Sequence, residues 1–494
     1  MSNNNCLDDT HSGSQDDSGS IGIMTEPALS EPLLKVAREV VWLPPNAHEL
    51  GIAAKWLPDS GGQVCRIGNF AADILRLANG TRNAESIADN LGVDAQAINA
   101  EILTLEQSIP GLFTRGAADR TVHSKQQQQL EVAKKMQRVW EAANWSVDSN
   151  AAFHETGIPD AHRQFDDIET TVSHLFREPH KALGGRRYGE AFCDWLLDSR
   201  MITAGANIME IGCGVGYFAS HVLNRLQHRA PELYDSISYT MFDLSPELQR
   251  SQRERCANHV RKIQFESGNA EEFDFGERRF DLIISNEVIA DLSVTPVCSS
   301  NVSRGTPQTE TEQLAIHYGL DCTPPFQGSS ARVAINSGAI RLVEKLSTIL
   351  VPGGHTVLTE YGTTDQLPDA VSFGDHFEFT IHFGHLKQVA QALGMKTRLE
   401  NLGDLLQFDR GFQILDLRTQ NSLAKALMPE LGYEELPTLA YDASMLQQLF
   451  GEAAVVENLE YQPLDEVQSL TPFRFFALIM QLPTPNHSDH PAVP

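Results

Sequence analysis

Residues 207–217 read Asn-Ile-Met-Glu-Ile-Gly-Cys-Gly-Val-Gly-Tyr, and this stretch decides the fold. An apolar run ends in Glu210, three glycines follow at alternate positions, and a helical pattern begins at Tyr217. A strand that enters a glycine turn at a helix N-terminus lets the backbone approach a ligand closely, because glycine has no Cβ. The spacing E-x-G-x-G-x-G is not the dinucleotide fingerprint G-x-G-x-x-G. A turn that binds another nucleotide, or none, is the alternative.

This turn resembles motif I of class I S-adenosylmethionine (SAM)-dependent methyltransferases. The resemblance implies that Glu210 lies near the methionine amino group of the cofactor. It also implies that Gly212, Gly214 and Gly216 make room for the amino-acid part of SAM, and that S-adenosylhomocysteine is a product.

The composition excludes several classes of protein. The 494 residues carry a net charge of −27, so the chain should repel phosphate backbones, and nucleic acid is not the expected substrate. No apolar run approaches the roughly 18 residues of a membrane span, and the polar N-terminus has no signal-peptide pattern. The seven scattered cysteines predict neither a disulfide framework nor a metal site. A cytoplasmic location fits these features.

Composition shifts divide the chain into five predicted segments. They are a disordered tail (1–34), a compact domain (35–115), a linker and helix (116–164), a second domain (165–485) and a short tail (486–494).

The compact domain is predicted to combine a small sheet with three helices, as a winged-helix domain does. Strands are expected at Val40–Leu43 and Gln63–Ile67, and helices at 70–77, 83–91 and 95–108. The run Arg66–Leu77, followed by Asn79-Gly80-Thr81, resembles the PqqD-like family, the recognition element for ribosomally made and modified peptides. The resemblance implies that the leader of a precursor peptide binds as an added strand. An ordinary winged-helix domain used for packing or homodimer formation is the alternative.

From about residue 165 the chain alternates strands and helices, among them a helix expected over 331–350 that stops at Pro352-Gly353-Gly354. This pattern predicts an α/β fold with a Rossmann-like, doubly wound parallel sheet. Residues 293–330 interrupt the alternation and are rich in Ser, Thr, Pro and Gly. Because they follow a strand end, they are predicted to cover the substrate, and a disordered surface loop is the alternative.

Ligands of such sheets sit beyond the carboxyl ends of the strands, which points to two more cofactor positions. Asp243 ends the strand after the glycine turn and can accept both ribose hydroxyls, unless it only caps the next helix. Asn269 and Ala270 follow the next strand, where the methyltransferase family borders the adenine, and a plain turn is the alternative.

Ser285, Asn286 and Glu287 end a further strand, at the position that usually faces the methyl group. Ser285 is expected to contact the cofactor, and Asn286 and Glu287 to be catalytic. A carboxylate here can hold and polarise a nitrogen nucleophile and receive its proton. The alternative for Glu287 is a helix cap or a surface ion pair.

Residues 286–294 resemble the Asn-Glu-Leu-Leu-Asp-Ala-Leu-Pro-Val signature of the MidA-like methyltransferases, a family linked to arginine methylation. Glu360-Tyr361-Gly362 stands where that family has Asp-Tyr-Gly, and residues 379–383 resemble its histidine segment. His382 is therefore a candidate second acid or base, with a structural histidine as the alternative. The order Ala290-Asp291 and Ser293 depart from the signature, which puts arginine chemistry in doubt.

Together these resemblances imply a SAM-dependent N-methyltransferase for the side chains of a precursor peptide, either Arg guanidinium or Asn amide. A peptide carboxylate is a third acceptor. Alternatives are an arginine methyltransferase for a folded protein partner, a non-catalytic peptide-binding scaffold, and a methyltransferase for small molecules.

Overall fold

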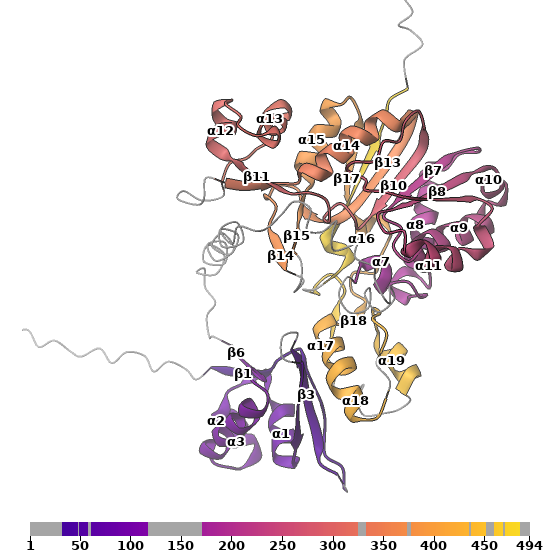
Figure 1. Ribbon diagram of the computed structural model, residues 1–494. Helices are drawn as coiled ribbons and strands as arrows, with labels where there is room; N and C mark the ends of the chain where they lie inside the picture. The colour runs from indigo at the N-terminus through magenta and orange to yellow at the C-terminus, as the bar shows by residue number, and fades with distance from the viewer. Residues whose placement is uncertain are drawn as a thin grey trace, which may run out of the picture.

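The computed structural model of the chain describes an N-terminal unit and a larger α/β unit (Figure 1). The described residues are 32–47, 49–57, 61–116, 170–324, 332–372, 377–433, 436–450, 459–467 and 470–484. The predicted tails and the predicted linker and helix at 116–164 lie outside these ranges, apart from residues 32–34 and 116.

The N-terminal unit consists of two three-stranded sheets and three helices. One sheet has the order β5-β1-β6 and the other the order β2-β3-β4. The elements are β1 (Leu33–Val36), β2 (Val40–Leu43), β3 (Gly51–Leu57), β4 (Gly61–Ile67), α1 (Asn69–Leu77), β5 (Asn79–Arg82), α2 (Ala84–Leu91), α3 (Ala95–Ser108) and β6 (Phe113–Gly116). The two predicted strands and three predicted helices are confirmed, and four further strands join them.

Both faces of the sheet β2-β3-β4 are covered. Successive residues of a strand point to opposite faces, so Trp42 and Ala53 pack against the three helices of the unit. Their neighbours Val41, Ile52 and Ala54 pack instead against residues from the C-terminal part of the chain. Strand β3 is apolar on both faces for this reason, and the sequence shows no period-2 alternation there.

The larger unit is built on one sheet with the order β17-β20-β13-β10-β7-β8-β9. Its strands are β7 (Asn207–Ile211), β8 (Ser238–Asp243), β9 (Ile263–Ser267), β10 (Phe280–Asn286), β13 (Leu350–Thr363), β17 (Lys396–Asn401) and β20 (Phe475–Gln481), with β16 (Ile381–His382) beside β13. Strands β9, β8, β7, β10 and β13 pair in parallel, whereas β20 is antiparallel to both β13 and β17. The predicted α/β fold is confirmed, but the sheet is mixed rather than wholly parallel.

Helices cover both faces of this sheet (Figure 1). One apolar cluster includes residues of α8 and α9, and a second includes residues of α14 and α15. The helices are α7 (Val172–Leu175), α8 (Tyr188–Asp198), α9 (Tyr217–Arg229), α10 (Pro231–Ser236), α11 (Leu248–Arg255), α12 (Ser299–Arg304), α13 (Glu310–Tyr318), α14 (Ser337–Ile349), α15 (Phe383–Ala392) and α16 (Leu402–Leu405). Except for α7, each of these helices follows or precedes a strand along the chain, as the alternating sequence pattern predicts.

Two predicted elements differ from the structure around residues 293–354. The helix expected over 331–350 begins only at Ser337, because Arg332–Ile335 is strand β12, which pairs with β11 (Thr295–Cys298). Residues 352–354 lie within the long strand β13. The described part of the predicted insert 293–330 contains β11, α12 and α13, and is therefore structured rather than a plain loop.

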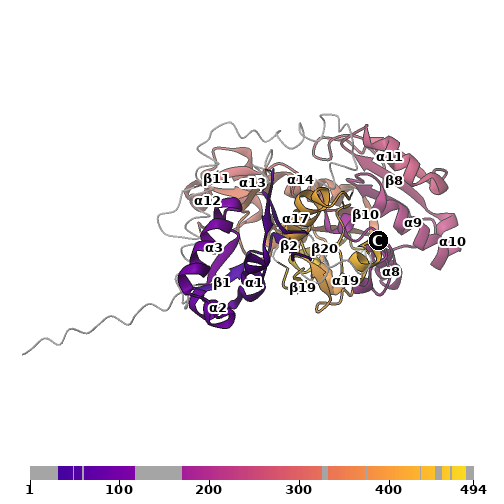
Figure 2. The same ribbon diagram turned by 90° about the horizontal axis from the view of Figure 1, so that it is seen from below.

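A continuous helix, residues 417–430, joins the two units. It consists of α17 (Leu417–Ser422), the π-helical turn η3 (Leu423–Leu427) and α18 (Met428–Glu430), and it is called the bridging helix below. Leu423, Ala426 and Leu427 pack against the sheet β2-β3-β4. Figures 1 and 2 both place α17 beside the N-terminal unit. Strands β18 (Gln413–Leu415) and β19 (Tyr461–Pro463) and helix α19 (Ala443–Phe450) complete this region.

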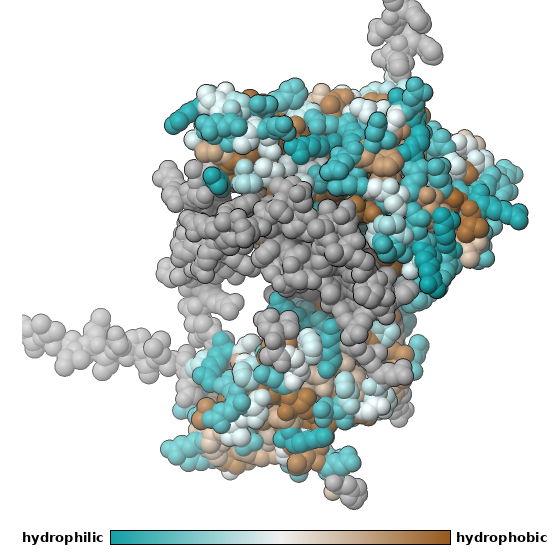
Figure 3. Space-filling view, viewed as in Figure 1, coloured by the Kyte–Doolittle hydropathy of each residue, from teal (hydrophilic) through white to brown (hydrophobic). Residues whose placement is uncertain are grey.

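The described surface gives no sign of a membrane span. None of the helices in the described ranges combines the length and the apolarity that crossing a bilayer requires. On the visible face, hydrophilic residues predominate over the larger unit, and hydrophobic residues are interspersed on the N-terminal unit (Figure 3).

Replacement of Leu427 by Ala tests the joint between the units. Leu427 is 0% exposed and belongs to the apolar cluster that both units share. We expect the variant to lose about 2–5 kcal/mol of unfolding free energy in urea, because a buried leucine is replaced by a cavity. Leu449→Ala is the control, since Leu449 is 57% exposed and should change stability by less than about 0.5 kcal/mol. Equal effects of the two variants would show that the joint adds no stability.

Candidate active site

A cavity lies at the carboxyl ends of the parallel strands. Its volume is about 620 Å³, within the range of about 300–1,000 Å³ that small-molecule sites occupy. Residues from the ends of β7, β8, β9, β10 and β13 line it, together with the start of α7, strand β15 (Phe377–Phe379), α17 and the start of β20. The cavity therefore lies where an open α/β sheet binds its ligand.

The glycine turn forms one wall of the cavity. Gly212, Gly214 and Gly216 all have positive φ angles (76°, 49° and 86°), which other residues seldom adopt. A Cβ on Gly212 would lie 2.0 Å from Cγ2 of Val288, so this position has no room for a side chain. Gly212 and Gly214 line the cavity, whereas Gly216 does not and serves as the N-cap of α9. The turn is thus a narrow backbone cradle, as the sequence predicts.

Glu210 is buried at the end of β7, where it lines the cavity behind this cradle. It accepts a hydrogen bond of 2.7 Å from the Tyr239 hydroxyl. Burial raises the pKa of Glu210 to about 8, and the nearby carboxylate of Asp243 acts in the same direction. A buried carboxyl group without a cationic partner favours its neutral form, so this site suits a ligand that brings a positive charge.

Asp243 connects the cradle to the next turn. One carboxylate oxygen accepts the Gly214 N–H at 2.8 Å, and the other accepts the Ser245 N–H at 3.1 Å. The bond to Ser245 closes a local turn, and Asp243 does not cap the next helix, because α11 begins at Leu248 with Glu247 as its N-cap. Carboxylate oxygens accept hydroxyl donors, so Asp243 suits the hydroxyls of a ribose. Asp243 also lines the cavity.

The adenine neighbours expected after β9 lie beside Asp243. Asn269 and Ala270 both line the cavity, and the Asn269 side chain accepts the Glu271 N–H at 2.9 Å. Phe242, Leu244 and Leu248 add apolar surface to the same wall. A polar turn next to apolar side chains can hold a planar heterocycle, so these residues fit the adenosine part of SAM. Ser285, in contrast, is fully buried, and the described lining of the cavity does not include it.

Glu287 makes contacts that the sequence named only as an alternative. Its carboxylate accepts the N–H groups of Val172 (2.6 Å) and Ser173 (2.9 Å), so it caps the start of α7, and it accepts the Asn286 amide at 3.0 Å. Its φ angle of 57° is unusual for a residue with a side chain, and surrounding contacts must hold such a backbone in place. Glu287 still lines the cavity, so a role at the acceptor stays a prediction.

Asn286 lies at the centre of a buried polar network. Its side-chain oxygen accepts the Tyr188 hydroxyl at 2.6 Å and the Thr359 hydroxyl at 2.8 Å, while its amide group donates to Glu287. These bonds fix the orientation of the amide. Asn286 therefore positions Glu287 and also lines the cavity.

His382 does not reach the described lining of the cavity. Its Nδ1 accepts the His385 N–H at 3.1 Å, and the two rings stack with centroids 3.7 Å apart. Burial lowers the pKa of His382. These contacts give His382 the structural role that the sequence left open, as the N-cap of α15, and place it away from the predicted acid/base position.

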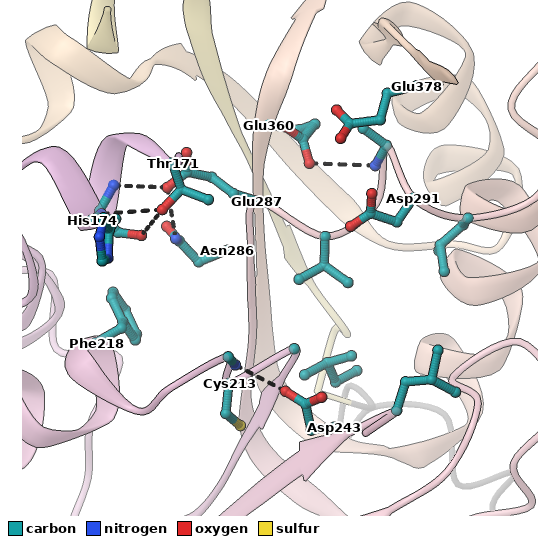
Figure 4. A pocket seen from close by; sticks show the side chains of 18 of the residues that line it. Thr171, His174, Cys213, Phe218, Asp243, Asn286, Glu287, Asp291, Glu360 and Glu378 are labelled. Carbon is teal, nitrogen blue, oxygen red and sulfur yellow. Dashed lines mark hydrogen bonds between the residues drawn. The ribbon is translucent and has the colours of Figure 1, made fainter. Parts of the chain in front are cut away.

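Three further acidic residues line the cavity beside Glu287. They are Asp291, Glu360 and Glu378, and Figure 4 shows all four carboxylates around the part of the cavity opposite Asp243 and Cys213. Glu360 is buried, and burial together with the charges of the other three raises its pKa well above the ordinary value. The sequence could have identified Glu360 as a cavity residue, because Glu360 lies near the end of a strand, as Glu210 and Asp243 do. Glu378 has no such signal.

Gly212→Ala tests the cradle. We expect loss of SAM binding in isothermal titration calorimetry, since the added Cβ meets Val288 and occupies a left-handed backbone position. Gly205→Ala is the matched control, because Gly205 has the same φ of 76° but no atom within 4 Å of an added Cβ. If both variants bind SAM equally, the cradle is not the binding wall.

The raised pKa of Glu210 predicts pH-dependent cofactor affinity. Only the ionised carboxylate pairs well with a cation, so affinity for SAM should rise as the pH increases towards about 8 and then level off. Well below that pH the slope should approach about tenfold per pH unit. Glu210→Gln should remove the slope between pH 6 and 7.5, as measured by calorimetry. A slope that persists in this variant would assign the titration to another group.

One comparison with known proteins agrees with this geometry. Residues 189–374 match a family model described as "Putative S-adenosyl-L-methionine-dependent methyltransferase". No curated protein matches the chain significantly.

Solved structures resemble the chain at low sequence identity. One is described as a "likely methyl transferase" from Burkholderia thailandensis bound to S-adenosyl-homocysteine. It has 13% identity and a TM-score of 0.36, and the match covers 74% of this chain and 95% of that chain. Another is an uncharacterised protein from the same organism, with 15% identity, a TM-score of 0.36, and 72% of this chain and 92% of that chain covered. A third is the CcbJ methyltransferase from Streptomyces caelestis, with 12% identity, a TM-score of 0.29, and 66% of this chain and 100% of that chain covered.

The family-model match spans β7 to β13, and with them the glycine turn, Asp243 and Asn286. The protein is a SAM-dependent methyltransferase, and SAM is its cofactor.

Proposed function

We propose that the protein transfers methyl groups from SAM to nitrogen atoms in the side chains of a ribosomally made precursor peptide. The favoured acceptor is an arginine guanidinium, and an asparagine amide is the second acceptor. The N-terminal unit recruits the leader of the peptide. The observation that carries the proposal is the cluster of four carboxylates around the end of the cavity opposite Asp243.

The charge of this cluster favours a cationic acceptor. Glu287, Asp291, Glu360 and Glu378 are four carboxylates in one cavity, and the only described arginine in the lining is Arg474, whose side chain is exposed. Within the described residues no three acidic, histidine or cysteine side chains lie close enough to hold a metal ion. A planar guanidinium can donate to several carboxylates at once, which suits such a spread-out cluster.

The raised pKa of Glu360 supports proton transfer at this end. When bound, SAM supplies an electrophilic methyl group, and the acceptor nitrogen must lose a proton during transfer. A raised pKa makes a carboxylate a stronger base, and the positive charge of a bound guanidinium would favour its ionised form, so Glu360 suits this task. Glu287 accepts three hydrogen bonds and is better suited to hold the acceptor in place.

The N-terminal unit offers a strand edge for a peptide. Among the described strands, β4 pairs only with β3, so its other edge is open for an added strand. Its side chains alternate: Cys65 packs towards the helices of the unit, while Val64 packs towards the bridging helix. Two small sheets and three helices support the proposal that this unit is a winged-helix, PqqD-like domain. A folded protein partner, methylated on arginine, remains the second candidate function because the acidic cluster serves it equally well.

Tandem mass spectrometry tests the proposal. The full chain is co-expressed with each short reading frame that adjoins its gene, and the peptides are sequenced. We expect a mass increase of one CH₂ unit per transfer on Arg or Asn side chains, and loss of modification when the leader part is deleted. An unmodified peptide, despite SAM binding by the enzyme, would favour the folded protein partner.

Glu360→Gln tests the assignment of the base. The variant keeps the shape of the side chain but cannot accept the proton, so we expect kcat to fall by about 10²–10⁴ with SAM affinity retained. The exposed Glu232 on α10 provides the control Glu232→Gln, which should leave kcat unchanged. A kcat unchanged in Glu360→Gln would remove Glu360 from the mechanism.

A further inference from the structure

The bridging helix presents two opposite faces to two different parts of the molecule. Leu417 and Asn421 line the cavity, and a spacing of four residues places them on one face of α17. Thr419 and Ser422 lie about 150° around the helix from that face, at about 100° per residue. This second face of the helix contacts the N-terminal unit.

Both residues of the second face bond to the N-terminal unit. The Thr419 hydroxyl donates to the backbone carbonyl of Arg38, just before β2. The Ser422 hydroxyl accepts the backbone N–H of Trp56 in β3 at 3.2 Å. One turn and a half of helix therefore connects the N-terminal sheet directly to the wall of the active site.

The cavity face of α17 belongs to the acceptor end rather than the cofactor end. Asp243 and the cradle lie over β8 and β7, whereas Tyr361 and Phe475, which line the cavity with Leu417 and Asn421, come from β13 and β20. In the sheet order, β10 separates these two groups of strands. Asn421 is half-buried, and its amide has no hydrogen-bond partner among the described residues, so it can bond to a ligand.

The other end of the bridging helix follows the open strand β4. Gly62 of β4 lies against Ala426, and Arg66 of β4 forms an ion pair with Glu430 at 3.6 Å. A peptide strand added to β4 would therefore lie next to α18 as well as next to its pairing partner. Between these two ends the helix contains the π-helical turn η3, a type of distortion that often marks functional sites.

We propose that the bridging helix connects peptide docking on β4 to the acceptor end of the cavity. Leu417 and Asn421 contact the acceptor side chain, and Thr419 and Ser422 are positioning residues that set where these two side chains lie. The part that concerns the peptide rests on the proposed function. The connection between the N-terminal sheet and the cavity wall rests only on the contacts above.

Hydrogen exchange measured by mass spectrometry tests the connection without any acceptor. The full chain with S-adenosylhomocysteine is compared with Thr419→Val/Ser422→Ala, which removes both bonds and changes the shape little. We expect at least about fivefold faster exchange in residues 417–423 and also in 470–475, the neighbouring cavity wall, because helix ends loosen locally when contacts are lost. Exchange in 210–217 and affinity for S-adenosylhomocysteine should stay within about twofold.

Ser347→Ala is the matched control, because Ser347 also makes a side-chain hydrogen bond to a backbone carbonyl, on α14. If the double variant exchanges hydrogen in residues 470–475 at the same rate as the wild type, the connection is overturned. Should the double variant fail to fold, judged by circular dichroism, the two single variants are measured in the same way.

Kinetics with a peptide identified by co-expression provides the second measurement. The double variant should lower kcat about five- to tenfold with an unchanged KM for SAM, and Asn421→Ala should raise KM for the peptide. Unchanged constants in both variants would overturn the roles of these residues. If wild-type enzyme modifies no peptide, that result counts against the proposed function, while hydrogen exchange still decides the connection.

Discussion

The parallel pairing of β7, β8, β10 and β13 is the constraint on which the site depends. Parallel strands end at the same edge of the sheet, so residues far apart in the chain meet there. Glu210, Asp243, Asn286 and Glu360 each lie at or near the end of one of these strands, and all four line the cavity. A shift of one strand by one residue would turn its final side chain to the opposite face of the sheet.

This arrangement concentrates negative charge at two places in one cavity. Glu210 and Asp243 lie at the cofactor end, and the cluster of four carboxylates lies at the other end. Buried carboxylates are unfavourable unless they are protonated or meet a cation, which is why the pKa values of Glu210 and Glu360 are raised. SAM brings both an ammonium and a sulfonium. Under the proposed function, the guanidinium brings the charge for the second group.

The sequence predicts the cofactor end better than the acceptor end, for a physical reason. Glycines with positive φ and an acidic residue at a strand end are local features, so Gly212, Gly214 and Asp243 could be identified from short stretches. The acceptor end is assembled from separate segments. Asn421 and Glu378 enter the cavity from elements that have no motif, and only tertiary packing brings them there.

Packing contacts that a local sequence pattern does not show also explain three features of the fold. His382 has an attractive residue type and sequence context, but its ring stacks on His385 at the start of α15. Strand β3 has apolar residues on both faces, since the bridging helix covers the face that would otherwise be exposed. Residues 332–335 form a strand because β11, about 35 residues earlier in the chain, pairs with them. In the last two cases a distant partner overrides the local pattern.

Because the bridging helix covers one face of the sheet β2-β3-β4, it affects how peptide recognition and methyl transfer would work together. A recognition domain on a free linker raises only the local concentration of a tethered substrate. Here the two units share an apolar cluster, and the helix between them contributes side chains to the cavity. Under the proposed function, a core peptide would extend from a fixed strand edge towards a fixed cavity. The length of chain between the docked leader and the acceptor would then decide which side chains reach the carboxylates, so the active site itself needs little selectivity for the neighbouring sequence.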